Sequence, residues 1–107
     1  MPVIELNSSS FDSEVLQSDI PVLVDFWSPT CVPCRALVPV LNSLDENNDG
    51  DVKIAKVNVF DCPDIAQRYG VSSLPSLIFF KGGTVAEKML GVQSQEKLQN
   101  VLDELTE

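Results

Sequence analysis

The sequence predicts a single α/β domain, residues 1–107, in which helices cover both faces of a central mixed β-sheet. Two observations lead to this prediction. Stretches typical of buried strands alternate with stretches typical of helices along most of the chain, and this order places strands side by side in parallel. A Gly-Gly pair then separates two further strand-like stretches, which adds an antiparallel hairpin. The length suits one domain, and the 44% hydrophobic content is enough for a core.

The first two expected elements are a short strand and a helix. Residues 3–6 alternate between apolar and polar side chains, which is typical of an edge strand. Three serines at positions 8–10 offer N-caps for a helix over about residues 11–18. Val15 and Leu16 would face inward from that helix.

The next expected element is a strand over residues 21–27. This stretch is nearly continuously apolar and rich in β-branched side chains, which indicates a strand buried on both faces. Asp25 is the exception within it. A carboxylate in such a strand is costly unless it is paired, neutralised or used in chemistry.

A helix is expected over about residues 34–47, directly after this strand. Pro33 suits its first turn, whereas Pro39 lies inside it, removes a backbone hydrogen bond and should kink it. Its apolar residues recur at helical spacing: Leu37, Val38, Leu41 and Leu44.

The second half of the chain begins with another central strand, over residues 52–59, which contains Lys56. A short helix follows from Cys62 to about Tyr69, and Gly70 ends it.

A hairpin and a helix complete the chain. Residues 76–81 and 84–90 are strand-like and flank the turn at Gly82 and Gly83. Ser94 can cap a last helix, in which four apolar residues form one stripe: Leu98, Val101, Leu102 and Leu105.

The chemistry centres on Cys31-Val32-Pro33-Cys34, where two thiols lie three positions apart between a strand and a helix. Such a pair in such a place is typical of dithiol–disulfide redox chemistry. A purely structural disulfide would gain little, because the loop that it closes is very short. A four-ligand zinc site would need two more Cys or His ligands, yet only Cys62 remains and the chain has no histidine.

The charge balance excludes other classes of function. Seven basic and 16 acidic residues give a formal charge of −9, which repels nucleic acid. The charge favours partners with basic docking surfaces, although a role in solubility alone explains it equally well.

No apolar run approaches the ~20 residues of a membrane span, and residues 1–12 lack the features of a signal peptide. We therefore expect a cytoplasmic protein that binds neither membranes nor nucleic acid.

These motifs resemble the thioredoxin family from one end of the chain to the other. Residues 22–27 followed by Cys31-Val32-Pro33-Cys34-Arg35 resemble its strand and active-site loop, and Pro39 matches its helix-kinking proline. Further matches lie at Lys56-Val57-Asn58-Val59, Tyr69-Gly70-Val71, Leu74-Pro75-Ser76, residues 79–83 and Gly91. The resemblance implies the thioredoxin fold. Thr30 and Val32 depart from the usual Trp and Gly of the family, and we expect them to affect reduction potential, rate and choice of partner.

The resemblance implies a thiol–disulfide oxidoreductase that reduces protein disulfides. Cys31, at the start of a helix, would attack as a thiolate, and Cys34 would resolve the mixed disulfide. The redox-active Cys31–Cys34 disulfide would replace any cofactor or metal. Partners would be disulfide-containing proteins and, as electron donor, a thioredoxin reductase, flavin–nicotinamide or ferredoxin-linked. We expect a monomer.

Asp25 is the candidate proton acceptor and donor for Cys34, because burial raises a carboxyl pKa toward neutrality. Lys56, on the adjacent strand, would moderate the pKa of Asp25. The alternative for these two residues is a structural buried ion pair. Trp27 would pack beside the motif.

Pro75 is the candidate cis-proline of the family and would pack against the cysteine pair. The alternative is an ordinary turn proline, since only ~5% of such bonds in folded proteins are cis. The expected substrate-binding residues are Thr30, Val32, Pro33, Leu74, Pro75, Gly91 and Val92, and Leu74 would offer backbone groups to an extended peptide. We expect Cys62 to be a small buried residue, with glutathionylation or dimer linkage as the alternatives.

Two other functions compete with a general reductase. Thr30 and Val32 suit a specialised relative that acts as an oxidant, an isomerase or the electron donor of a single target. A binding module of the same fold, without redox activity, is the other alternative. The presence of Cys31, Cys34, Asp25 and Pro75 together argues against it.

Overall fold

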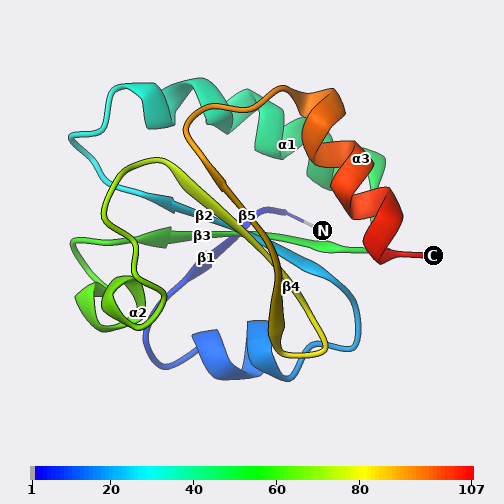
Figure 1. Ribbon diagram of the computed structural model, residues 1–107, viewed down its shortest axis with the longest axis horizontal. Helices are drawn as coiled ribbons and strands as arrows, with labels where there is room; N and C mark the ends of the chain where they lie inside the picture. The colour runs from blue at the N-terminus through cyan, green and yellow to red at the C-terminus, as the bar shows by residue number, and fades with distance from the viewer. Residues whose placement is uncertain (1) are drawn as a thin grey trace.

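The computed structural model describes residues 2–107, whose five strands form one mixed sheet in the order β1-β3-β2-β4-β5 (Figure 1). The strands are β1 (Ile4–Leu6), β2 (Val22–Trp27), β3 (Lys53–Asn58), β4 (Ser76–Lys81) and β5 (Thr84–Leu90). The first three run parallel to one another, whereas β4 is antiparallel to β2 and to β5. The predicted mixed sheet is confirmed, with β2 at its centre.

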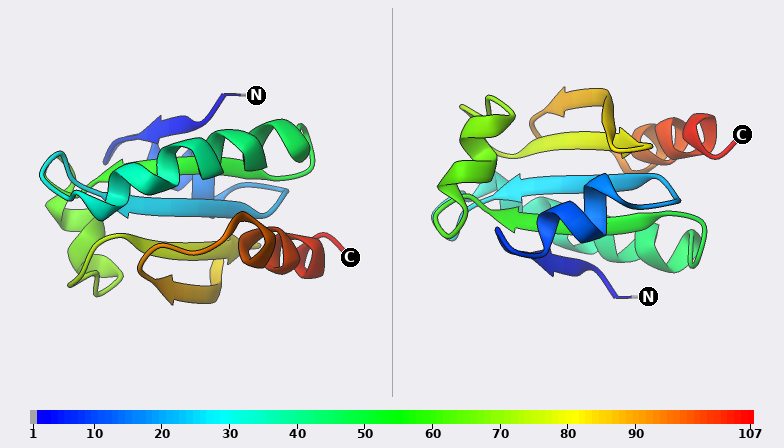
Figure 2. Two further views of the ribbon diagram at one scale, coloured as in Figure 1. Left: turned by 90° about the horizontal axis from the view of Figure 1, so that it is seen from above. Right: turned by 90° about the horizontal axis from the view of Figure 1, so that it is seen from below.

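Helices cover both faces of the sheet (Figure 2). Helices α1 (Leu37–Asn47) and α3 (Gln95–Leu105) lie over one face, and the short helices η1 (Asp12–Leu16) and α2 (Pro63–Arg68) lie over the other. Side chains of β2 alternate between the two cores, because successive residues of a strand point to opposite faces. Leu23 packs with α1 and α3, and Val24 and Phe26 pack with η1 and α2. Asp25 therefore faces α1.

The expected single helix over residues 34–47 is divided in two. A turn of 3-10 helix, η2 (Pro33–Ala36), precedes α1 and carries Cys34. Pro39 explains the division, because it has no N–H for the carbonyl of Arg35 and its ring crowds that carbonyl. Of the four apolar residues at helical spacing, Leu37, Leu41 and Leu44 are buried, whereas Val38 is 43% exposed.

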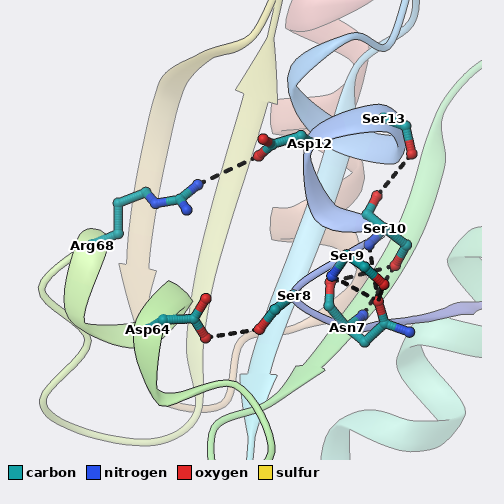
Figure 3. Close-up of polar contacts among 8 residues, drawn as sticks. All are labelled: Asn7, Ser8, Ser9, Ser10, Asp12, Ser13, Asp64 and Arg68. Atoms are coloured by element: carbon teal, nitrogen blue, oxygen red, sulfur yellow. Dashed lines mark hydrogen bonds and ion pairs between the residues drawn. The ribbon is translucent and has the colours of Figure 1, made fainter.

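The helix expected over residues 11–18 is shorter, and its cap differs from the prediction. It has one wide turn, in which Gln17 N–H donates to the Asp12 carbonyl over 3.0 Å. The serines do not cap it. Instead, Asn7 Oδ1 accepts hydrogen bonds from the N–H groups of Ser9 and Ser10, both 2.9 Å long, and so closes the turn before the helix (Figure 3). Val15 is buried as expected.

Polar contacts join the η1 region to α2 (Figure 3). Ser8 Oγ donates to Asp64 Oδ1 over 2.8 Å, and Arg68 lies 3.5 Å from Asp12 Oδ1. The hydrogen bond from Ser8 is the main cause of a pKa of Asp64 below its ordinary value. The two short helices are thus fixed to each other on the face away from α1.

The turn between β4 and β5 needs glycine at both of its central positions. Gly82 and Gly83 have φ angles of 60° and 80°, in the left-handed region that L side chains rarely adopt. A Cβ atom at Gly83 would also lie 2.6 Å from the Leu16 carbonyl oxygen. The hairpin therefore packs closely against the end of η1.

The last helix is capped as predicted, because Ser94 Oγ accepts a hydrogen bond of 3.1 Å from the Lys97 N–H. Leu98 and Leu102 are fully buried. No helix within residues 2–107 is long and apolar enough to cross a membrane.

Candidate active site

The two cysteines of the motif form a disulfide at the carboxyl end of β2, with their Cα atoms 5.4 Å apart. Their exposure differs, because Cys31 is partly exposed whereas only 4% of Cys34 is accessible. The Cys34 N–H donates to Cys31 Sγ over 3.2 Å. Cys31 is therefore the more accessible cysteine of the pair, and its sulfur accepts a hydrogen bond from the helical turn that follows.

A tight turn presents Cys31 at this position. The Cys31 N–H donates to the carbonyl of Ser28 over 3.2 Å. The hydroxyl of Ser28 is buried and lies 3.4 Å from the hydroxyl of Thr30. These contacts fix the backbone between β2 and η2, so Cys31 is held by local hydrogen bonds.

Asp25 is the buried charge of the site. Only 1% of the residue is accessible, and its Oδ1 atom has no hydrogen-bond partner. Burial raises the pKa of Asp25 to about 7, and Glu5 adds to this increase, whereas the positive charge of Lys56 opposes it. The group therefore gains and loses a proton near neutral pH.

Lys56 lies beside Asp25 on the neighbouring strand, since the two residues are partners in the β2–β3 register. Its Nζ atom lies 4.5 Å from the centre of the Trp27 ring. The Trp27 Nε1 atom is buried, and an interaction of the indole with the Glu5 side chain lowers the pKa of that carboxyl against the larger effect of burial. Lys56 therefore acts on Asp25 through space, while its ammonium group lies over the indole.

A cavity of about 90 Å³ connects these groups. The structure brings five of the predicted site residues together around it: Asp25, Trp27, Cys31, Cys34 and Lys56. Its wall is completed by Ser28, Pro29, Arg35 and Val38. A cavity of this size has room for water, and Asp25 Oδ1, which has no other partner, can bind it, which makes a proton path between Asp25 and the cysteines feasible.

The Leu74–Pro75 bond is cis, as predicted. Because β4 runs antiparallel to β2 and pairs Ser76 with Phe26, Pro75 lies at the same end of the sheet as the cysteines. The Gly91 N–H donates to the Pro75 carbonyl over 2.8 Å. This bond places the start of β4 beside the end of β5.

The expected substrate-binding residues lie outside the cavity. Val32 is 68% exposed and Val92 is 47% exposed, whereas Pro75 is buried and Leu74 is partly buried against the core. None of the seven lines the 90 Å³ cavity: Thr30, Val32, Pro33, Leu74, Pro75, Gly91 and Val92. The site thus has an inner part that surrounds Asp25 and an outer part that faces solvent.

Sequence reasoning missed several residues of the inner part. Arg35 and Val38 line the cavity, and Glu5 acts on Asp25 from the edge strand. The alternation in residues 3–6 placed Glu5 on a strand, but its strand partner depends on pairing with a distant segment. Cys62 is 1% exposed, which confirms its expected burial. Within residues 2–107, no group of three or more His, Cys, Asp or Glu could hold a metal ion.

Comparison with known proteins gives consistent results over nearly the whole length. The family model described as thioredoxin matches residues 2–104. Thioredoxin 1 of Nostoc sp. is 40% identical over 99 residues, which cover 92% of each chain. The thioredoxin of Porphyra purpurea is 39% identical over 103 residues, 96% of each chain. Chloroplastic thioredoxin M4 of Arabidopsis thaliana is 39% identical over 92% of this chain and 51% of its own.

Proposed function

Because the chain belongs to the thioredoxin family, we propose that Cys31 is the attacking thiolate and Cys34 the resolving thiol of its reaction. The protein is a thiol–disulfide oxidoreductase that reduces protein disulfides. Thioredoxins work through their own cysteine pair and need no added cofactor. The observation that carries the assignment of roles is the unequal exposure of the two cysteine residues within one disulfide.

In the first step, the Cys31 thiolate attacks one sulfur of the substrate disulfide. A new bond joins Cys31 to that sulfur, and the other substrate sulfur leaves as a thiolate. The Cys34 N–H supports this step, because a hydrogen bond to Cys31 Sγ favours the charged form of the sulfur.

In the second step, Cys34 attacks Cys31 Sγ in the mixed disulfide. The Cys31–Cys34 disulfide forms, and the second substrate sulfur is released. Cys34 is buried and must lose its proton inside the protein. Asp25 is suited to accept it through the shared cavity, since its pKa of about 7 allows it to accept and release protons at neutral pH.

The outer part of the site supplies the substrate-binding surface in this proposal. Val32, Pro33 and Val92 offer exposed apolar contacts, and the backbone of Leu74, next to the cis-proline, offers hydrogen-bonding groups to an extended peptide. Thr30 and Gly91 complete the surface. Apolar side chains flank many substrate disulfides, and a surface of this kind favours them.

Members of the family act on disulfide-containing proteins and receive electrons from a reductase. We propose that a thioredoxin reductase is the donor here and that the protein works as a monomer in the cytoplasm. The formal charge of −9 supports docking to reductase and substrate surfaces that carry basic residues. A chloroplastic relative makes a plastid the alternative compartment.

The reduction of insulin by dithiothreitol tests the assignment. The wild-type protein should accelerate precipitation of the insulin chains, and Cys31→Ser should abolish the acceleration. Cys62→Ser, which removes the free thiol in the core on the other face of the sheet, is the matched control and should remain active. Full activity of Cys31→Ser would contradict the proposal. A reduction potential far above that of reducing thioredoxins would favour a specialised oxidant, the function that Thr30 and Val32 suit.

A further inference from the structure

Glu5, Lys56 and Asp25 form a row across three neighbouring parallel strands. The register pairs Glu5 of β1 with Lys56 of β3, and Lys56 with Asp25 of β2. Partners in adjacent parallel strands direct their side chains to the same face of the sheet, so all three face α1. Lys56 therefore stands between two carboxylates, of which Asp25 is buried and Glu5 is exposed.

Lys56 also separates two cavities. The 90 Å³ cavity of the active site contains Asp25, and a second cavity of about 260 Å³ lies next to it, beneath α1. Glu5 and Asn42 line the second cavity only, whereas Lys56 and Val38 line both. The ammonium group of Lys56 can therefore be drawn toward either side of this shared wall.

We propose that Glu5 is a positioning residue for the acid–base step, because it competes with Asp25 for the ammonium group of Lys56. This inference rests on the acid–base role proposed above for Asp25. It adds a control that acts from the far side of Lys56, from the edge strand β1.

The charges around the row support this competition. Removal of the Glu5 charge would leave Lys56 to Asp25 alone and would also remove repulsion between the two carboxylates, and both effects lower the pKa of Asp25. Arg35, Cys31 and Cys34 face Asp25 within its cavity. Lys56, the Trp27 side chain and Asp61 act on Glu5. Helix α1 contributes only Val38, Leu41 and Asn42 to the two cavities, and β4 places Leu77 beside Asp25.

The decisive measurement is the titration of the Asp25 carboxyl in the oxidised protein, followed by carbon NMR. Glu5→Gln should move the midpoint from about 7 downward by roughly half a pH unit, the effect of one charge about 10 Å away in a partly solvated setting. Glu5→Asp keeps the charge and should stay near the wild type. Glu87→Gln is the matched control, because it removes the same charge from β5, at the opposite edge of the sheet.

The pH dependence of insulin reduction is the second readout, and its acid limb should move with the titration. An unmoved Asp25 titration in Glu5→Gln, or an equal shift in Glu87→Gln, would overturn the inference. If the titration moves and the rate profile does not, Glu5 still controls Asp25, and the acid–base role of Asp25 fails instead.

Discussion

The ammonium group of Lys56 lies 4.5 Å from the centre of the Trp27 ring. A contact of this kind contributes about 0.5–2 kcal/mol, depending on how far the pair is removed from water. Trp27 and Asp25 belong to the same strand and face the same side of the sheet, so the indole fixes the cation where its field reaches the buried carboxyl. The tryptophan beside the cysteines therefore has an electrostatic consequence in addition to packing.

Replacement of Lys56 by Gln should raise the pKa of Asp25 above its value of about 7, because Lys56 is the group that lowers it. Asp25 would then stay protonated at neutral pH, and insulin reduction at pH 7 should slow while the acid limb of the rate profile moves to higher pH. Lys81→Gln removes the same charge from the exposed end of β4 and serves as control. An unchanged profile in Lys56→Gln would contradict the role of Lys56.

Asp25→Asn should stabilise the protein at high pH. The pKa of Asp25 is about 7 in the folded protein and about 3.9 in an unfolded chain. The folded state holds this proton more tightly, so ionisation destabilises it fully above pH 7 and not at all below pH 4, at a cost of about 4 kcal/mol.

Denaturation of the oxidised protein by guanidinium at pH 8 and pH 4 measures this effect. Asp25→Asn should increase the free energy of unfolding by about 3 to 4 kcal/mol at pH 8 and change it little at pH 4. Asp19→Asn, in an exposed loop, should show no such pH dependence. Equal stabilisation at both pH values would mean that charge is not its cause.

Val32→Ser should weaken the binding of protein substrates. Val32 is 68% exposed beside the reactive sulfur, and loss of its apolar surface from a docked complex should raise the KM for insulin roughly three- to tenfold. Reduction of a small aromatic disulfide, which does not cover Val32, should be unaffected. Val85→Ser makes the same change at an exposed position on β5 and should leave both activities as they are. A fall in kcat with unchanged KM would assign Val32 to the chemistry rather than to docking.

Gly83→Ala should destabilise the fold more than Gly82→Ala. Both glycines have left-handed backbone angles, which costs an alanine about 1 kcal/mol. Only at Gly83 does the added Cβ meet a neighbour, the Leu16 carbonyl oxygen at 2.6 Å, so its total cost should reach at least about 2 kcal/mol. Midpoints of guanidinium denaturation compare the two variants, and similar values would show that the hairpin moves away from η1 without penalty.

Patterns within short stretches of the sequence predicted the strands and helices whose conformation depends on neighbouring residues. The apolar run before the cysteines became the central strand β2, and Ser94 caps α3 as expected. The serines at positions 8–10 looked equally suitable as caps, but Asn7 closes that turn with two hydrogen bonds of its own. A sequence with several adjacent capping residues does not show which of them accepts the bonds.

The active site, too, was predicted from the sequence only in part. The spacing of the cysteines and their place after a strand indicated the chemistry, and the buried Asp25 was visible as a charge in an apolar run. Glu5 was not visible, because its effect depends on the register of β1 against β3, which pairs residues that are far apart in the chain. Long-range pairing therefore sets the electrostatics of a site whose reactive atoms local sequence already identifies.

The third cysteine reports on motion. Cys62 is 1% exposed and packs in the core beneath η1 and α2, on the opposite face of the sheet from Asp25. A thiol reagent in solution can therefore reach it only when that side of the molecule opens. In the oxidised protein, the rate at which Cys62 is labelled therefore measures how often the η1–α2 side opens locally, and no engineered probe is needed.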